Sequence, residues 1–293
     1  MLEIKERNPF SNLVLEVLDD PSKKEMIFYF LCYSQLVRRE GSFHVELEKF
    51  LSCAYRNFKN NRHYWKDVMV EMNLFVISDL YGNLYTGKDI YKVDEGGIYM
   101  VSLRKDYVYL FDSISYKALK LWNILSRTGT YRKHMTAQDA VFVSALLFND
   151  GLYEELKGYC EVCVERYQLE SSYFRALGWL SEVYLEPSTK AHQKLKAVLS
   201  ELQNLSGVYY GVNILKLRRD VEVALGRVER GKGIETIKLE FVNYKRKGEG
   251  LLSRLFLKFK GFLRGLFNRE DKNRLYALEG ALCIKNSRTL YIN

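Results

Sequence analysis

The scarcity of proline constrains the fold of this chain more than any other feature of its sequence. Three of its 293 residues are proline, namely Pro9, Pro21 and Pro187, whereas average usage is about 5%. Proline disrupts the interior of a helix because it lacks a backbone N–H and clashes with the preceding turn. A chain that is free of proline from residue 22 to residue 186 is therefore able to form a succession of long helices.

Composition narrows the class of protein further. Hydrophobic residues make up 47% of the chain and aromatic residues 14%, which is enough to bury a core and argues against a disordered chain. No uncharged apolar run reaches the roughly 18 residues that suggest a transmembrane helix, and the N-terminus lacks the apolar core of a signal peptide. The five cysteines are irregularly spaced, unlike a secreted disulfide framework. We therefore expect a cytoplasmic protein whose membrane contact, if any, is peripheral and on the inner face.

The first part of the chain, residues 1–112, is expected to form an α+β domain. Apolar residues recur at helical spacing in three segments, and short extended segments separated by turn signals follow them. The helices are expected at about 22–39, 44–58 and 63–72, and the extended segments at 74–80, 84–86, 90–93, 98–103 and 107–111. Three helices followed by β-hairpins are compatible with a winged helix-turn-helix domain.

In a helix-turn-helix protein the recognition helix enters the DNA groove, and here the start of the third expected helix is basic. The residues that would contact nucleic acid are Arg56, Lys59, Arg62, His63 and Lys66. The same fold can instead serve as a protein-interaction module, and unrelated α+β domains share this order of elements. The sequence leaves these three alternatives open.

Residues 113–230 are expected to form a helical array. Helices are predicted at 115–126, 140–148, 152–167, 171–185, 188–205 and 212–230, and short turns between them indicate antiparallel αα-hairpins. Thr136 followed by Asp139 resembles a capping box, with Asp in place of the usual Glu or Gln. The stretch Leu147–Leu156 resembles the inter-helix turn of tetratricopeptide repeats, although no second copy follows at a 34-residue period. This local resemblance implies a TPR-like helical hairpin.

The last part, residues 231–293, is expected to be a small β element that carries an amphipathic helix. Residues 234–244 alternate as in a strand, and residues 281–292 resemble a hairpin. Between them, residues 250–268 place nine apolar side chains within an arc of roughly 160° at 100° per residue. These nine are Leu251, Leu252, Leu255, Phe256, Phe259, Phe262, Leu263, Leu266 and Phe267. The rest of the helix surface carries Arg254, Lys258, Lys260 and Arg264, and the segment has no acidic residue.

This helix needs an apolar partner, and its charge indicates which one. Leu and Phe on one face with Lys and Arg on the other are typical of a helix that lies in a membrane interface. Between Lys238 and Arg274 the chain has 11 Lys or Arg against 4 Asp or Glu, and such a local field attracts the phosphates of anionic lipids or of nucleic acid. An anionic membrane surface is therefore the leading hypothesis. Packing on the protein's own core, and docking on a partner protein groove or on nucleic acid, are the alternatives.

No motif points to catalysis, and we expect no cofactor, metal or small-molecule substrate. The four histidines are not at metal-binding spacing, and no P-loop, G-x-G-x-x-G or G-x-S-x-G element is present. Cys160 and Cys163 form a C-x-x-C pair without a second pair at usable spacing. Because they lie in an expected helix beside Leu156, core packing is favoured over half a metal site or a disulfide.

The sequence thus predicts a helix-rich α+β protein in three parts that acts without catalysis. The favoured function is that of an interaction or scaffold protein that docks peripherally on an anionic membrane through residues 250–268. The alternative is a nucleic-acid-binding protein, such as a winged-helix regulator or a replication initiator. It would use residues 56–66 together with Lys245, Arg246 and Lys247.

Overall fold

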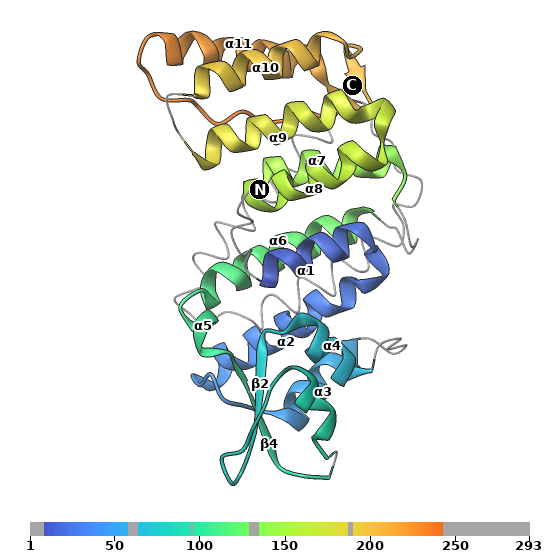
Figure 1. The fold of residues 1–293 in the computed structure, drawn as a ribbon, viewed down its shortest axis with the longest axis vertical. Helices are drawn as coiled ribbons and strands as arrows, with labels where there is room; N and C mark the ends of the chain where they lie inside the picture. The colour runs from blue at the N-terminus through green and yellow to red at the C-terminus, as the bar shows by residue number, and fades with distance from the viewer. Residues whose placement is uncertain (1–8, 58–63, 95, 129–134, 187–189, 243–293) are drawn as a thin grey trace. The chain divides into compact units, whose positions relative to one another are not determined.

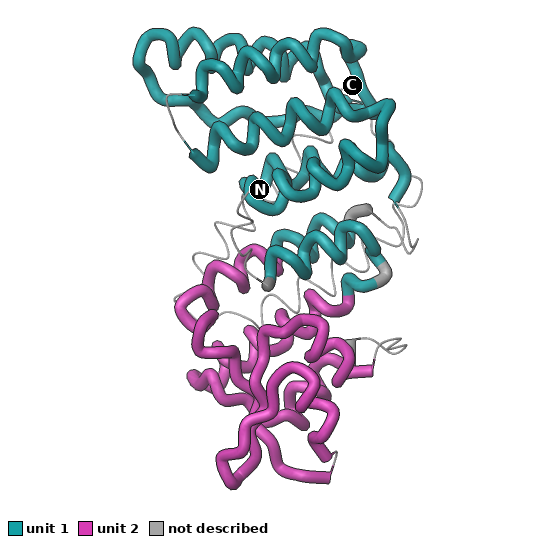
Figure 2. The backbone as a smooth tube through the Cα atoms, viewed as in Figure 1, with its two compact units in different colours: residues 1–24, 120–246 teal, residues 25–119, 247–293 magenta. Residues whose placement is uncertain are grey.

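A computed structural model describes residues 9–57, 64–94, 96–128, 135–186 and 190–242 (Figure 1). Within these ranges the protein is helix-rich and has a small antiparallel sheet, so the expected helix-rich α+β class is confirmed. The chain divides into two compact units (Figure 2). Of the described residues, those in 9–24 and 120–242 are here called the helical unit, and those in 25–119 the sheet unit. None of the helices in the described ranges combines the length and the apolar content that crossing a bilayer requires.

The sheet unit alternates helices with short strands. Its α-helices are α2 (Glu25–Glu40), α3 (Leu47–Asn57), α4 (Trp65–Met72), α5 (Lys105–Val108) and the first part of α6 (Phe111–Thr128). Its strands are β1 (Val45–Glu46), β2 (Phe75–Asp79), β3 (Leu84–Tyr85) and β4 (Tyr99–Leu103), and a 3-10 helix, η2 (Gly87–Lys92), lies between β3 and β4. The three helices expected before residue 73 are therefore present, each within a few residues of its expected start and end.

The four strands form one antiparallel sheet in the order β1-β4-β2-β3. β2 pairs with β4 over its whole length, and β1 pairs with the other side of β4 through Val45 opposite Val101. A short strand between the first two helices pairs with the last strand of a hairpin, which is compatible with the winged helix-turn-helix order that the sequence suggests. In that scheme α4 is the third helix, and the connection from β2 to β4 takes the place of the wing.

Two of the expected extended segments are helical, so those predictions are wrong. Residues 90–93 fall largely in η2, because the buried side chains there, Ile90 and Val93, are three residues apart, which suits a 3-10 turn and not a strand. Residues 107–111 cover the end of α5, a turn at 109–110 and the first residue of α6. Their aromatic residues favour strands in general, but Phe111 and Ile114 are buried at helical spacing, and packing overrides strand propensity.

Helix α2 lies in the core of the sheet unit. Every residue from Met26 to Ser34 is buried, and the ring of Tyr33 packs edge-on against Phe75 with the centroids 5.0 Å apart. The hydroxyl of Tyr33 donates to the carbonyl of Phe43 at 2.7 Å and accepts from the N–H of Leu103 at 2.9 Å. A single buried phenol therefore joins α2 to the chain before β1 and to the end of β4.

The helical unit is built almost entirely from helices. They are α1 (Pro9–Asp19), the later part of α6, α7 (Ala137–Asn149), α8 (Tyr153–Arg166), α9 (Ser171–Leu185), α10 (Ala191–Gln203) and α11 (Ile214–Glu229), with the 3-10 helices η1 (Pro21–Lys24) and η3 (Gln168–Glu170). A short hairpin of β5 (Val208–Tyr209) and β6 (Val212–Asn213) precedes α11. The helices expected after residue 136 are all present, and α9 has its expected bounds.

Successive helices from α7 to α11 pack on their neighbours in the chain, as αα-hairpins do (Figure 1). The series starts at the capping box that the sequence predicts. The hydroxyl of Thr136 accepts from the N–H of Asp139 at 3.2 Å, and the carboxylate of Asp139 accepts from the N–H of Thr136 at 3.3 Å. Both contacts satisfy main-chain donors that the first turn of a helix leaves without partners.

Charged contacts join three of these helices. Glu182 of α9 pairs with Lys157 of α8 at 2.7 Å and with Lys194 of α10 at 2.8 Å. Partial burial by itself raises the pKa of Glu182. The hydrogen bonds from the two ammonium groups outweigh that effect and hold the pKa below its ordinary value. The ionised carboxylate is therefore the form that fits this position.

Candidate functional site

After α11 the chain turns back and runs as an extended segment along the helical unit. Residues 233–242 are here called the strap. The side chains of Ile237 and Leu239 are 5% and 4% exposed, whereas Thr236 and Lys238 between and before them are exposed. The two buried residues thus fall on alternate positions, in line with the apolar and polar alternation of this segment.

The strap is not a regular strand in the part that the structure describes. The expected strand covered residues 234–244, but up to Val242 the single ladder contact is an isolated bridge between Phe241 and Val212. Most main-chain partners of the strap are instead side chains from the helices. These side chains make up the candidate site.

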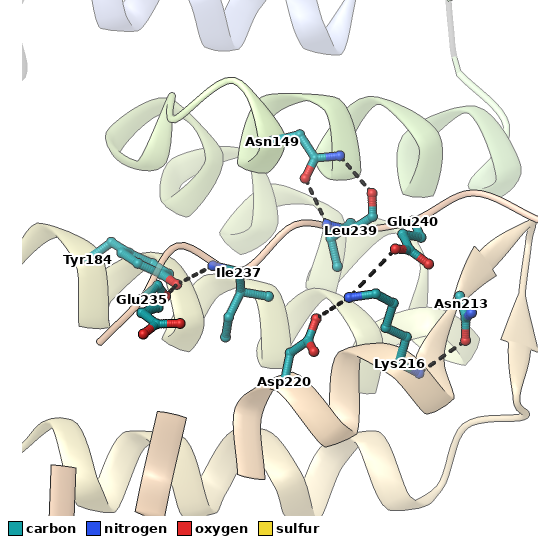
Figure 3. Close-up of polar contacts among 9 residues, drawn as sticks. All are labelled: Asn149, Tyr184, Asn213, Lys216, Asp220, Glu235, Ile237, Leu239 and Glu240. Atoms are coloured by element: carbon teal, nitrogen blue, oxygen red, sulfur yellow. Dashed lines mark hydrogen bonds and ion pairs between the residues drawn. The ribbon is translucent and has the colours of Figure 1, made fainter. Parts of the chain in front are cut away.

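Asn149, the last residue of α7, binds the strap backbone with both groups of its carboxamide (Figure 3). Its Nδ2 donates to the carbonyl of Leu239 at 2.8 Å, and its Oδ1 accepts from the N–H of the same residue at 2.8 Å. A carboxamide carries a donor and an acceptor side by side, so one Asn supplies the pair of contacts that a neighbouring strand would otherwise make. The main-chain carbonyl of Asn149 also accepts from the ammonium group of Lys238 at 2.6 Å.

Tyr184 of α9 binds the strap two residues earlier (Figure 3). Its hydroxyl accepts from the N–H of Ile237 at 2.9 Å and donates to the carbonyl of Glu235 at 2.9 Å. Burial raises the pKa of Tyr184 to about 12, against the opposite effect of the Ile237 N–H, so the phenol keeps the proton that it donates. Its ring is stacked on Tyr153 of α8, with centroids 4.8 Å apart and planes 11° apart, which fixes the position of the hydroxyl.

The start of the strap is held by the last turn of α11. Arg227 donates from Nε to the carbonyl of Gly233 at 2.9 Å, and its Nη1 lies 2.6 Å from the carboxylate of Glu235. The guanidinium group thus binds one main-chain and one side-chain acceptor of the strap. An acidic residue two positions before Ile237 is therefore favoured.

The end of the strap is held by the hairpin and the first turn of α11. The N–H of Asn213 donates to the carbonyl of Glu240 at 2.9 Å, and the Asn213 side chain caps α11 by accepting from the N–H of Lys216 at 3.0 Å. The ammonium group of Lys216 lies 2.7 Å from Asp220 and 3.6 Å from Glu240 (Figure 3). The hydrogen bond to Asp220 is the main cause of a raised pKa of Lys216, so this residue presents a stable positive charge to the strap.

Asn149, Tyr184, Lys216 and Arg227 are together called the strap-binding face. They offer contacts to an extended backbone, two buried positions for alternate apolar side chains, and a cation near each end. These are the elements by which proteins recognise extended peptides. The described residues contain no group of three or more His, Cys, Asp or Glu that could hold a metal ion. In this structure the face holds the chain's own segment 233–242.

The sequence did not point to Asn149 or Tyr184. Asn149 stands in the turn signal Asn149-Asp150-Gly151, and Tyr184 is one of 22 tyrosines. The available signal was the alternation of residues 234–241, which indicates a chain with one buried face and therefore a surface that receives it. It does not say which residues form that surface.

Most of the site residues proposed from the sequence lie outside the described residues. This holds for the whole amphipathic segment 250–268, for Lys245, Arg246 and Lys247, and for Lys59, Arg62 and His63. Arg56 is in the last turn of α3. Their roles stay predictions.

Lys66, the remaining member of the basic group, is described and is only 8% exposed. Its ammonium group donates to the carbonyls of Val93 at 2.6 Å and Tyr91 at 3.3 Å, and lies 5.4 Å from the ring centroid of Trp65. The ammonium group of Lys66 is therefore hydrogen-bonded inside the sheet unit. It joins α4 to η2 and to the residue that follows η2.

The exposed side of α4 is acidic. Asp67 and Glu71 are both exposed, and the hydroxyl of Tyr91 donates to Asp67 at 2.7 Å. In a winged helix-turn-helix domain this helix would face the negatively charged groove of DNA. Two carboxylates on its surface oppose that contact.

Cys160 and Cys163 are free thiols of α8 that are buried in the core, 2% and 1% exposed. Burial raises the pKa of Cys160 well above its usual range and that of Cys163 to about 12. Metal binding and nucleophilic chemistry both use the thiolate, which this apolar environment disfavours. Their surroundings are those of packing residues.

Comparison with known proteins gives one relative. No family model matches the chain, and no solved structure matches it. Over 273 residues, 92% of this chain and 87% of the other, it is 32% identical to an uncharacterized protein of Aquifex aeolicus (strain VF5). A match of that extent includes both compact units. This chain belongs to the same family as that Aquifex aeolicus protein.

Proposed function

We propose that this protein is a non-enzymatic scaffold that docks on an anionic membrane surface through the basic amphipathic segment 250–268. The observation that supports the proposal is the strap. Its main chain is bonded by Asn149, by Tyr184 and by the hairpin before α11. The chain therefore leaves the described part of the helical unit from a fixed position, immediately before its most basic stretch.

The physical basis of docking is the combination of charge and apolar surface in that stretch. Nine Leu and Phe side chains on one arc supply the apolar area, and Arg254, Lys258, Lys260 and Arg264 supply cations. Each basic residue near an anionic surface contributes about 1 kcal/mol of attraction. Apolar burial and electrostatic attraction together give reversible binding of an interfacial helix.

Co-sedimentation of the full chain with vesicles tests this proposal. We expect binding to vesicles that contain phosphatidylserine, weaker binding to phosphatidylcholine alone, and loss of binding in the variant Phe259→Glu, Phe262→Glu. The matched control is Ser253→Glu, Asn268→Glu, which adds the same two charges outside the apolar arc and should keep most of the binding. A wild-type chain that stays in the supernatant with anionic vesicles would sink the proposal.

Nucleic-acid binding is the second candidate, and one observation favours it. The order β1-β4-β2 with three helices before the hairpin is compatible with a winged helix-turn-helix domain. The acidic surface of α4 and the internal contacts of Lys66 oppose binding through α4 itself. Any such contact would therefore depend on Arg56, Lys59, Arg62 and His63, with the basic residues 245–247.

Salt-dependent binding to random duplex DNA tests the second candidate. Each phosphate contact contributes about one unit to the slope of log affinity against log salt. The triple variant Arg56→Ala, Lys59→Ala, Arg62→Ala should reduce that slope by up to about three. Lys196→Ala, Lys232→Ala, at exposed positions of the helical unit, is the control and should leave the slope unchanged. Absence of binding to duplex DNA at low salt would eliminate this candidate.

A further inference from the structure

The strap is bound to the helical unit in the way that a separate peptide is bound by its receptor. Side chains from three helices, α7, α9 and α11, contact its main chain, and both its ends carry ionic contacts. Main-chain contacts do not depend on the side chains of the bound segment. Any extended segment of suitable side-chain pattern is able to make them.

The side-chain pattern that this face accepts can be taken from the strap itself. Two apolar residues, Ile237 and Leu239, are buried two positions apart, and the residues between and before them are exposed. Glu235 pairs with Arg227 at 2.6 Å, and Glu240 lies 3.6 Å from Lys216. The pattern is therefore acidic, any residue, apolar, basic, apolar, acidic, since Lys238 donates to the carbonyl of Asn149.

The strap is also attached in a way that permits exchange. Gly231, which precedes it, has a φ of +68°, a conformation that glycine adopts at low cost, and Gly233 begins the strap. Between these glycines and Val242, two side chains are buried, whereas Glu235, Thr236, Lys238 and Glu240 are exposed. The helices from α7 to α11 also contact their neighbours directly, independently of the strap.

We propose that the strap-binding face is a docking site for a partner protein that presents an extended segment of this acidic and apolar pattern. The strap is its occupant in cis, and a partner segment binds by displacing it. This goes beyond the membrane proposal, since the contacts lie in the helical unit and need no lipid.

A labelled peptide with the strap sequence, residues 233–242, tests the inference by fluorescence anisotropy on the full chain. In the variant Ile237→Asp, Leu239→Asp the chain's own strap is weakened, and we expect this variant to bind the peptide at least ten-fold more tightly than the wild type. Adding Asn149→Ala should remove the gain. Thr236→Asp, at an exposed strap position, is the control and should behave as the wild type. A folded double variant that binds no better than the wild type would overturn the inference, as would binding that Asn149→Ala leaves unchanged.

Hydrogen exchange on the wild-type chain gives a second test that does not depend on the double variant folding. An isotope-labelled strap peptide is added at about 1 mM, which is the order of effective concentration for a segment on a short linker. The amides of Ile237 and Leu239 in the chain should then exchange faster, because the peptide replaces the strap. Unchanged exchange at saturating peptide contradicts the proposal. Neither test contains lipid. Failure of the peptide tests therefore leaves the membrane proposal unaffected, and the vesicle experiment tests that proposal separately.

Discussion

At the scale of single residues, Asn149 supplies the pair of main-chain contacts that one residue of a neighbouring strand would make. Its carboxamide bonds both main-chain groups of Leu239, a residue 90 positions away in the chain, at 2.8 Å each. Without these contacts a partly buried N–H and C=O would lose their partners, and an unsatisfied buried polar group is more costly than a hydrogen bond is favourable. Asn149 is therefore expected to stabilise the fold through the N–H and the C=O of Leu239 that it bonds.

Asn149→Ala should therefore lower the free energy of unfolding by about 1–3 kcal/mol. Urea denaturation followed by circular dichroism measures the change. The control is Asn204→Ala, which alters an exposed Asn at the end of α10 and should change the free energy by less than about 0.5 kcal/mol. Equal effects of the two variants would argue against the contact as described.

Glu182 makes a pH-dependent contribution. Its pKa in the folded protein is below the ordinary 4.5, so the stabilisation is present above pH 4.5 and is lost as pH falls through the folded pKa. Glu182→Gln should be less stable than the wild type at pH 7 by about 0.5–1 kcal/mol, the range of partly exposed pairs. The difference should vanish at pH values well below 4.5. Thermal unfolding over this range measures it, with the exposed Glu186→Gln as control; a difference that persists in acid would count against the pairing.

At the scale of elements, the start of α7 was predictable because its signal is local. Thr136→Ala removes the hydroxyl that caps the helix and should destabilise the protein by about 1 kcal/mol. Thr136→Ser keeps that hydroxyl and should retain most of the stability. Thermal unfolding of the two variants measures the difference, and equal loss in both would show that the capping contact contributes nothing.

Helices could be predicted from the sequence more completely than the site. Periodic apolar residues and local caps place the helices from α7 to α11, because these signals lie within each segment. Residues 107–111 were predicted wrongly, since the burial of Phe111 on the α6 face is set by distant residues. The strap-binding face also depends on distant pairs. Tyr184 and Ile237 are 53 positions apart, and no local pattern joins them.

Tyr184 and Asn149 should each protect the strap residue that they bind. Tyr184→Phe removes the hydroxyl that accepts from Ile237, so the amide of Ile237 should exchange with solvent faster while that of Leu239 changes less. Asn149→Ala should produce the reverse order. Residue-resolved hydrogen exchange measures both. If both variants accelerate the two amides equally, the strap is released as one unit and the contacts do not act separately.

At the scale of the whole molecule, the chain combines a helical unit that binds its own extended segment with a sheet unit whose strands lie in the order β1-β4-β2-β3. The match to the relative covers 92% of the chain, so the family likeness extends over both units. The scaffold that we propose would combine the strap-binding face of the helical unit with a membrane anchor at residues 250–268. A nucleic-acid-binding protein would instead make its main contacts through the sheet unit.

The most direct test of the scaffold proposal is a competition between anionic vesicles and duplex DNA for the full chain. Labelled protein, random duplex DNA and phosphatidylserine vesicles are mixed, and the vesicles are sedimented. The proposal predicts that the protein pellets with the vesicles and that added DNA removes little of it, because the Leu and Phe arc of residues 250–268 inserts only into lipid. Protein that stays in the supernatant bound to DNA would contradict it.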